Sequence, residues 1–304
     1  MQGLAEAERT ATGQDGVLSR WQALRGGLAA REVDALRRSR RWWPMGCGTY
    51  FVASPGHPRP GRRAAIRAVQ LSLGPDAVLV HDTAAEWFGL VARHDGAPVH
   101  VAAPGRRGRA AGPRGAAVVH QWAVPAAART TVAGLRVTTA RRTVADLLRV
   151  AARDDAVAVL DAALHRSLVG ADDLAALPAL LRGRRGAVAA RARLALADGR
   201  AACGLETLVR LRCVDGGVPP EELQVPVRDR AGRIVTRGAL GWPSRGLIVE
   251  ADGVPGHRDA AALDAARQRH NRIADAGWRM LRFAWRDTAR PGLIPRRVRA
   301  ALDG

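Results

Sequence analysis

The last hundred residues alternate between strand-like and helix-like patterns in an order that restricts the possible folds. A helical segment at 204–217 precedes a hairpin pattern around the turn 229–232. The apolar run "RGLIVEADG" at 245–253 ends in acidic residues, and a helical segment at 259–277 leads into a final strand at 278–285. Periods of two and of 3.6 residues distinguish the strands from the helices. Helix, three strands, helix, strand and C-terminal helix predict an α/β sandwich around a central sheet.

Carboxylates at the end of the apolar strand form the candidate site. Glu250 and Asp252 are two residues apart, so both side chains leave the same face of a strand. Cleavage of a phosphodiester by a hard cation needs oxygen ligands that converge from neighbouring elements. The predicted metal ligands are Glu250 and Asp252, with Mg²⁺ or Mn²⁺ as the cofactor if the site functions.

Residues 200–304 resemble the PD-(D/E)xK nuclease superfamily, in particular its very-short-patch-repair-like branch. The resemblance rests on Glu206, "RGALGWP" at 237–243, "IVEADG" at 248–253, His257 and "RHNRIADAGWRMLRFAW" at 269–285. Related sequences carry an Asp where this chain has Ala239, and Asp252 occupies the position of the usual Lys. The resemblance therefore implies a restriction-endonuclease-like fold whose metal centre lacks a ligand. It also implies the candidate catalytic residues: Glu206, Glu250, Asp252 and His257. A catalytically impaired domain is predicted, with an active metal-dependent DNA endonuclease as the alternative.

These residues also have structural interpretations. Glu250 and Asp252 suit a strand-end turn, because Asp-Gly favours loops. Glu206 can pair with Arg210 one helical turn away, and His257 in a polar loop is compatible with a structural role. The tryptophans of this region are expected to be core aromatics that cover the sheet: Trp242, Trp278 and Trp285.

The first 57 residues contain two helical stretches followed by a hairpin pattern. Ser19 and Gln22 form a capping box ahead of the first stretch, and "LAAREVDALRRS" at 28–39 places its apolar residues near one helical face. "RRWWPMGCGTYFVA" at 40–53 has strand-forming residues on both sides of Gly46-Cys47-Gly48. Helix, turn, helix and hairpin in this order predict a winged helix.

This segment resembles the winged-helix domain that opens AbiEi-type antitoxins. The stretches at 77–90 and 135–148 resemble the portion that follows it in the same family. The resemblance implies a type IV toxin-antitoxin or phage-defence setting, in which the protein represses its own promoter. In a winged helix one helix enters the major groove while the wing touches the backbone. The candidate DNA-binding residues are arginines of the second helix and the wing base: Arg31, Arg37, Arg38, Arg40 and Arg41.

Residues 58–199 predict a mixed α/β middle region after a Pro- and Gly-rich linker. Strand patterns at 77–80, 98–103 and 116–124 are interspersed with helices, and the stretch from 139 onward is mostly helical. Interruptions of the helical pattern are expected at Gly170, Pro178 and Gly183. The chain as a whole is predicted to be an α+β multidomain protein. Its domains are a winged helix at 1–57, the mixed α/β middle region at 58–199 and a restriction-endonuclease-like α/β sandwich at 200–304.

The balance of charge favours a polyanionic partner. The chain has 48 arginines, no lysine and 28 acidic residues, which gives a net charge of +20. Double-stranded DNA is the natural candidate, although high-GC coding produces the same arginine bias without selection for binding. The three cysteines are too few and too widely spaced for a disulfide framework or a zinc site.

The sequence also bears on location and on the rival functions. No apolar run approaches the length of a membrane span, and the N-terminus lacks the layout of a signal peptide. We therefore expect a cytoplasmic DNA-binding protein of regulatory or defence type, an antitoxin-like transcriptional regulator, with enzymatic activity left open. The alternatives are an active metal-dependent endonuclease and an antitoxin that works mainly by binding a toxin protein.

Overall fold

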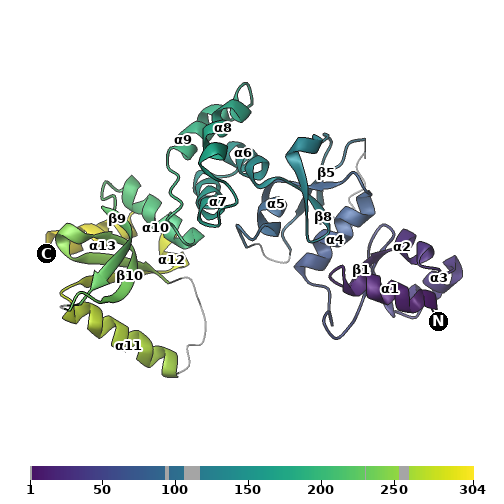
Figure 1. The fold of residues 1–304 in the computed structure, drawn as a ribbon, viewed down its shortest axis with the longest axis horizontal. Helices are drawn as coiled ribbons and strands as arrows, with labels where there is room; N and C mark the ends of the chain where they lie inside the picture. The colour runs from purple at the N-terminus through teal and green to yellow at the C-terminus, as the bar shows by residue number, and fades with distance from the viewer. Residues whose placement is uncertain (1, 93–95, 106–116, 230, 253–259) are drawn as a thin grey trace. The chain divides into compact units, whose positions relative to one another are not determined.

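A computed structural model describes residues 2–92, 96–105, 117–229, 231–252 and 260–304. The chain forms two compact units, Met1–Leu147 and Leu148–Gly304, which Figure 1 shows as a ribbon. Each unit contains both helices and a β-sheet, so the chain is a multidomain α+β protein. The boundary falls inside the region 58–199 that the sequence pattern groups together. In the part of the chain that is described, no helix is long and apolar enough to cross a lipid bilayer.

The first unit begins with a module of helices and a three-stranded antiparallel sheet. Its elements are α1 (Gln2–Thr12), β1 (Val17–Ser19), α2 (Arg20–Arg25), α3 (Ala30–Arg38), β2 (Trp42–Gly46) and β3 (Thr49–Val52), with β3 between β1 and β2. The predicted capping box is confirmed: Ser19 Oγ accepts from the amide of Gln22 at 3.1 Å, and the Gln22 side chain accepts from the amide of Ser19 at 2.9 Å. Leu18, Val33 and Trp42 are buried in the core of the module.

A five-stranded sheet with helices completes the first unit. Its elements are α4 (Arg62–Leu73), β4 (Val78–Leu79), α5 (His81–Trp87), β5 (Val99–Ala102), β6 (Ala117–His120), η1 (Ala126–Ala128), β7 (Arg129–Val132), β8 (Leu135–Thr138) and α6 (Ala140–Val150). The strand order is β6-β5-β4-β8-β7. Ile66 and Val69 of α4 belong to the same buried cluster as Leu79 and Val101, so α4 covers one face of this sheet.

The second unit begins with helices α7 (Arg153–His165), α8 (Ala171–Leu181) and α9 (Ala187–Leu194). The interruption expected at Pro178 is wrong, because α8 continues through this residue. Proline in a helix interior removes one backbone hydrogen bond. Leu177 and Leu181 are fully buried on either side of it, and this burial outweighs the local preference to break the helix.

The C-terminal sheet lies between helices on both of its faces. The elements are α10 (Gly204–Asp215), β9 (Glu222–Arg228), β10 (Ile234–Trp242), η2 (Pro243–Arg245), β11 (Leu247–Ala251), α11 (Ala260–Asp275), β12 (Arg279–Phe283), α12 (Trp285–Thr288) and α13 (Leu293–Asp303). The strand order is β12-β11-β10-β9, with β11 and β12 parallel and the other pairs antiparallel.

Two buried clusters show which helix covers which face of the C-terminal sheet. Leu205 of α10 and Ile294 of α13 pack with Val249 on one face. Ile273 of α11 packs with Ile248 on the other. Because Val249 and Ile248 are neighbours in β11, their side chains point to opposite faces. The predicted α/β layering of this region is therefore present.

The three tryptophans of this region differ in their burial. Trp242 is 4% exposed, and its indole donates to the carbonyl of Pro219 at 2.9 Å. Trp278 is half-buried. The prediction that Trp285 is a core aromatic is wrong, because its side chain is 50% exposed. The predicted strand at 278–285 includes this residue, but β12 ends at Phe283 and Trp285 begins the short helix α12 instead.

Candidate functional site

The predicted acidic residues of the C-terminal region line one small cavity. Its volume is about 200 Å³, and its walls are Glu206, Gln224, Arg237, Ala239, Glu250, Ala251, Asp252 and Arg269. The sheet register explains the meeting of the two strands, because Leu240 pairs with Val249 and this places Ala239 of β10 opposite Glu250 of β11. The structure thus brings Glu206, Glu250 and Asp252 together around Ala239, whereas His257 lies outside the described residues.

Two arginines that the sequence analysis did not single out hold the carboxylate of Glu250. Its Oε2 atom accepts from Arg269 Nη2 at 2.9 Å and from Arg282 Nε at 3.2 Å. The Glu250 side chain is only 14% exposed, so this charge-assisted contact is only weakly screened. Arg282 lies directly across the parallel pair of β11 and β12 from Glu250. This contact depends on the register between β11 and β12, two strands that a helix separates in the sequence. A local sequence pattern contains no information about that register.

The same two arginines retain capacity for another acceptor. Within the described residues, Nε of Arg269 and Nη2 of Arg282 are buried and have no hydrogen-bond partner. An unsatisfied buried donor costs free energy unless water or a ligand supplies the missing acceptor. These two N–H groups, next to Glu250, are therefore able to donate hydrogen bonds to an oxygen atom of water or of a ligand.

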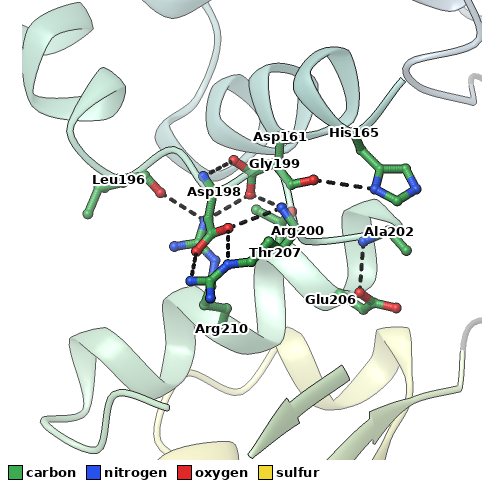
Figure 2. A network of polar contacts seen from close by, with 10 residues as sticks. All are labelled: Asp161, His165, Leu196, Asp198, Gly199, Arg200, Ala202, Glu206, Thr207 and Arg210. Carbon is green, nitrogen blue, oxygen red and sulfur yellow. Dashed lines mark hydrogen bonds and ion pairs between the residues drawn. The ribbon is translucent and has the colours of Figure 1, made fainter. Parts of the chain in front are cut away.

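Glu206 enters the cavity from the first turn of α10 and is held by neutral donors. Its Oε2 atom accepts from the amide of Ala202 at 2.8 Å and from the side chain of Gln224 at 3.0 Å. Burial raises the pKa of Glu206, although these hydrogen bonds favour the charged form. The alternative of a pair with Arg210 is wrong, because Arg210 binds Asp161 instead; Figure 2 shows Glu206 with Ala202, apart from that pair.

The carboxylates of Glu206, Glu250 and Asp252 line this cavity, but several features of its described residues disfavour a divalent cation such as Mg²⁺. Such a cation needs several oxygen ligands that are free to coordinate it. Here Ala239 presents a methyl group, and the Glu250 carboxylate is already shared between two guanidinium groups. A cation at this point would also approach the positive charges of Arg269 and Arg282. The unsatisfied N–H groups of Arg269 and Arg282 can instead bind a hydrogen-bond acceptor.

The second candidate site is the arginine-rich face of α3 in the N-terminal module. Arg31, Arg37 and Arg38 are exposed on this helix, and Arg40 and Arg41 are exposed just after it. Within the described part of the chain, the first four of these form no ion pair, whereas Arg41 lies 3.4 Å from Glu8 of α1. The five predicted DNA-binding arginines therefore form one exposed basic segment.

A bidentate ion pair fixes α3 against α2. Arg20 of α2 donates to the two carboxylate oxygens of Asp34 at 2.8 and 3.3 Å. The hydrogen bond from Arg20 lowers the pKa of Asp34, and the charges of Arg37 and Arg38 act in the same direction. Asp34 is therefore ionised at neutral pH, and it holds the two helices in a fixed relation beneath the exposed arginines.

Comparison with known proteins identifies relatives for most of the chain. Residues 76–196 match the AbiEi antitoxin C-terminal domain family. The uncharacterized proteins MT2308 and Rv2248 of two Mycobacterium tuberculosis strains are each 32% identical to this chain over 239 residues, which is 78% of this chain and 86% of each relative. The crystal structure of the RV2827C protein from Mycobacterium tuberculosis aligns with a TM-score of 0.38 and 18% identity, over 62% of this chain and 75% of that chain.

The family match and the two candidate sites occupy different parts of the chain. The matched segment 76–196 begins just before β4 and ends after α9. It therefore includes neither the arginines of α3 nor the walls of the acidic cavity.

Proposed function

The chain belongs to the family of the uncharacterized Mycobacterium tuberculosis proteins MT2308 and Rv2248, and we propose that it is a DNA-binding regulator of the antitoxin type. The match of residues 76–196 to the AbiEi antitoxin C-terminal domain supports the antitoxin part of this proposal. In this proposal the N-terminal module contacts DNA in the cytoplasm. The C-terminal region has an endonuclease-like fold, serves as a binding scaffold and does not cleave.

The exposed arginine face of α3 is the observation that carries the DNA-binding part. The order α1-β1-α2-α3-β2-β3, with β3 between β1 and β2, supports a winged helix. In that fold the helix equivalent to α3 enters the major groove. A guanidinium group donates two parallel hydrogen bonds, which match a phosphate or the edge of a guanine. Arg37 and Arg38 are the best placed for such contacts, because both are exposed at the end of α3.

The salt dependence of DNA binding tests this assignment. Each phosphate that a protein neutralises contributes roughly 0.9 to the slope of log K against log salt. The variant Arg37→Gln/Arg38→Gln should therefore bind a duplex from upstream of its own gene with a slope smaller by about 2, provided that both residues contact phosphate. The matched control is Arg182→Gln/Arg184→Gln, which removes the same charge from exposed residues after α8. Equal losses in the two variants would refute a specific role for α3.

The arginine pairing of Glu250 supports a C-terminal domain that binds DNA without cutting it. The helix, three-strand, helix and strand order is the one expected of the nuclease-like fold. Its acidic strand is retained, yet Glu250 contacts Arg269 and Arg282, and Ala239 lacks a carboxylate. The unsatisfied arginine nitrogens beside the cavity suit a phosphate oxygen of a bound duplex.

Plasmid cleavage distinguishes this scaffold from the alternative of an active endonuclease. Supercoiled plasmid should stay intact with Mg²⁺ or Mn²⁺ at protein concentrations that shift duplex DNA. Nicking that disappears in Glu250→Ala would establish the endonuclease instead. Ala239→Asp adds a further comparison: a gain of cleavage shows that the missing carboxylate disables the site, whereas a wild-type chain that already nicks and is unchanged by Ala239→Asp is an active enzyme.

A cavity in the first unit favours toxin binding as a second candidate function. It has a volume of about 810 Å³ and is lined by residues of the N-terminal module, of α4 and of the β7–β8 hairpin. Trp21 and Leu24 of α2 lie in its wall and are 62% and 40% exposed. Exposed large apolar side chains around a hollow are typical of protein contact surfaces.

Co-purification with the product of a neighbouring toxin gene tests this second function. Trp21→Ala should weaken the complex, whereas Trp285→Ala, which truncates a tryptophan that is 50% exposed in the second unit, should not. Recovery of DNA but no protein partner would count against toxin binding.

A further inference from the structure

Histidine side chains from two neighbouring strands and from the start of α5 converge on one point of the first unit. His81 follows β4 and opens α5, His100 lies in β5, and His120 ends β6. One ring nitrogen of each residue lies within 4.8 Å of the corresponding nitrogens of the other two. Nδ1 of His100 is 3.2 Å from Nε2 of His120. All three side chains are half-buried.

The sheet register imposes this convergence. In the parallel pair of β5 and β6, Ala102 lies opposite His120. His100 is two residues from Ala102, so His100 and His120 project from the same face. The amide of Val80 donates to the carbonyl of His100 at 3.0 Å, which brings the adjacent His81 to the same place. The amide of His100 in turn donates to Thr83 Oγ1 of α5 at 2.9 Å.

The local environment favours neutral imidazole rings. The pKa of His81 is lowered to about 4, mainly by burial, and the charge of His120 contributes in the same direction. Burial also lowers the pKa of His120. Trp122 packs against both rings, with centroid distances of 6.3 and 6.2 Å. An imidazole ring has a nitrogen whose lone pair can coordinate a cation, and the three rings bring such atoms within 4.8 Å of one another.

His81 also has an unusual backbone conformation. Its φ is +50°, a value that residues other than glycine seldom adopt. Such strain costs free energy and persists where the surrounding structure holds the residue in place. Here it aims the first side chain of α5 toward the two histidines of the sheet.

We propose that His81, His100 and His120 bind a divalent transition-metal ion, for which zinc is the best-fitting candidate. Three imidazoles are a known ligand set for zinc, and they leave one position open for water or another ligand. A tetrahedral ion with Zn–N bonds of about 2.0–2.1 Å holds its ligand atoms roughly 3.3 Å apart. The 3.2 Å between the nitrogens of His100 and His120 matches this spacing.

A buried carboxylate supplies compensating charge to the metal site. Asp146 of α6 is 4% exposed, and its negative charge acts on both His81 and His120. Carboxylates next to metal-bound histidines commonly orient the ring and raise its affinity for the ion. Arg142 pairs with Asp146 at 2.6 Å, which fixes the carboxylate in position.

A metal at this point would link β5, β6 and α5 inside the segment that matches the antitoxin family. The three histidines and Asp146 all lie within residues 76–196. The site shares no residue with the arginines of α3 or with the acidic cavity. The proposal therefore does not depend on DNA binding, and its test measures metal alone.

Metal titration of the full-length, untagged chain tests the proposal. After dialysis against a chelator, zinc should bind at one equivalent per chain and raise the melting temperature. Cobalt should give the intense visible absorption of a tetrahedral site. His120→Ala should lower zinc affinity at least tenfold and abolish that absorption. His165→Gln, which alters an exposed histidine outside the cluster, should change neither result.

Two outcomes would overturn the proposal. One is wild-type chain that binds less than half an equivalent of zinc and gives no tetrahedral cobalt spectrum, a result that requires no variant to fold. The other is zinc affinity that is unchanged in both His120→Ala and the milder His100→Asn, with circular dichroism confirming that both variants are folded. The first shows that the cluster is only a packed group of imidazoles, and the second places the metal elsewhere.

Discussion

The buried pair of Asp161 and Arg210 joins α7 to α10 and allows a quantitative test of what holds the second unit together. Asp161 accepts from Arg210 Nη2 and Thr207 Oγ1, each at 2.8 Å, and from the amide of Asp198 at 2.7 Å (Figure 2). Arg210 also donates to the carbonyl of Leu196 at 2.8 Å. The Asp161 and Arg210 side chains are only 1% and 9% exposed.

The expected cost of breaking this pair follows from its burial. Burial raises the pKa of Asp161, although its donors favour the charged form, so taking the carboxylate out of water costs more than its partners compensate. Removing one member of a buried pair leaves the other without compensation and costs about 3–5 kcal/mol. For a unit of this size, that lowers the melting temperature by roughly 6–20 °C. We therefore expect a loss in this range for Asp161→Asn and for Arg210→Met.

Calorimetry of the full chain, with a double-mutant cycle, measures this coupling. The double variant Asp161→Asn/Arg210→Met should be less destabilised than the sum of the single variants by more than about 1 kcal/mol. Asp215→Asn is the matched control: Asp215 pairs with Arg153 at 2.7 Å between the same two helices, but the side chains are 44% and 37% exposed. An exposed pair contributes at most about 1 kcal/mol. Additive single losses, or equal losses for Asp161→Asn and Asp215→Asn, would refute the reasoning.

Three further variants test local features of the fold. Gly241→Ala should destabilise the second unit by about 1–3 kcal/mol in chemical denaturation, because a Cβ there would lie 2.7 Å from a valine methyl group of β9. Ser19→Ala should cost about 1 kcal/mol in the same assay by removing the cap of α2. Asp15→Asn should make the free energy of unfolding depend less on pH in the acidic range. Burial alone would raise the pKa of Asp15, but Arg63 and Arg67 together lower it. In the wild type the ionised Asp15 therefore stabilises the fold above the unfolded pKa, and this contribution is lost as the pH falls through the folded pKa.

Local sequence patterns predicted those elements whose residues carry their own signals. The capping box at Ser19 marks the start of α2, and Gly277, with φ of +80°, ends the segment of α11. The β7–β8 hairpin was not predicted, because four-residue strands joined by Ala133 and Gly134 contain too short a pattern. The strand β1 was missed for the same reason, since its three residues are defined only by their pairing with β3.

In the candidate sites, too, residues with a local sequence signal were predicted and residues that meet only through strand pairing were not. Glu250 and Asp252 were predicted to share a face from their spacing alone, and both line the cavity. Arg282 was not predicted, because it meets Glu250 only through the parallel pairing of β11 with β12. The histidine cluster was not predicted either. Its three members come together through strand pairings across long stretches of sequence, which no local motif records.

The arginines around Glu250 explain how an acidic strand can remain in a domain proposed to bind DNA. In an active nuclease of the fold that we propose for this domain, a bound cation would screen the carboxylates from the phosphates. The guanidinium groups of Arg269 and Arg282 together carry the charge of one divalent cation, and both contact the same carboxylate oxygen. They therefore neutralise Glu250 without a metal, so a nearby phosphate meets less repulsion. Under the proposed function, Ala239 and the arginine pairing act together: Ala239 offers no ligand for a cation, and the two guanidinium groups supply positive charge in its place.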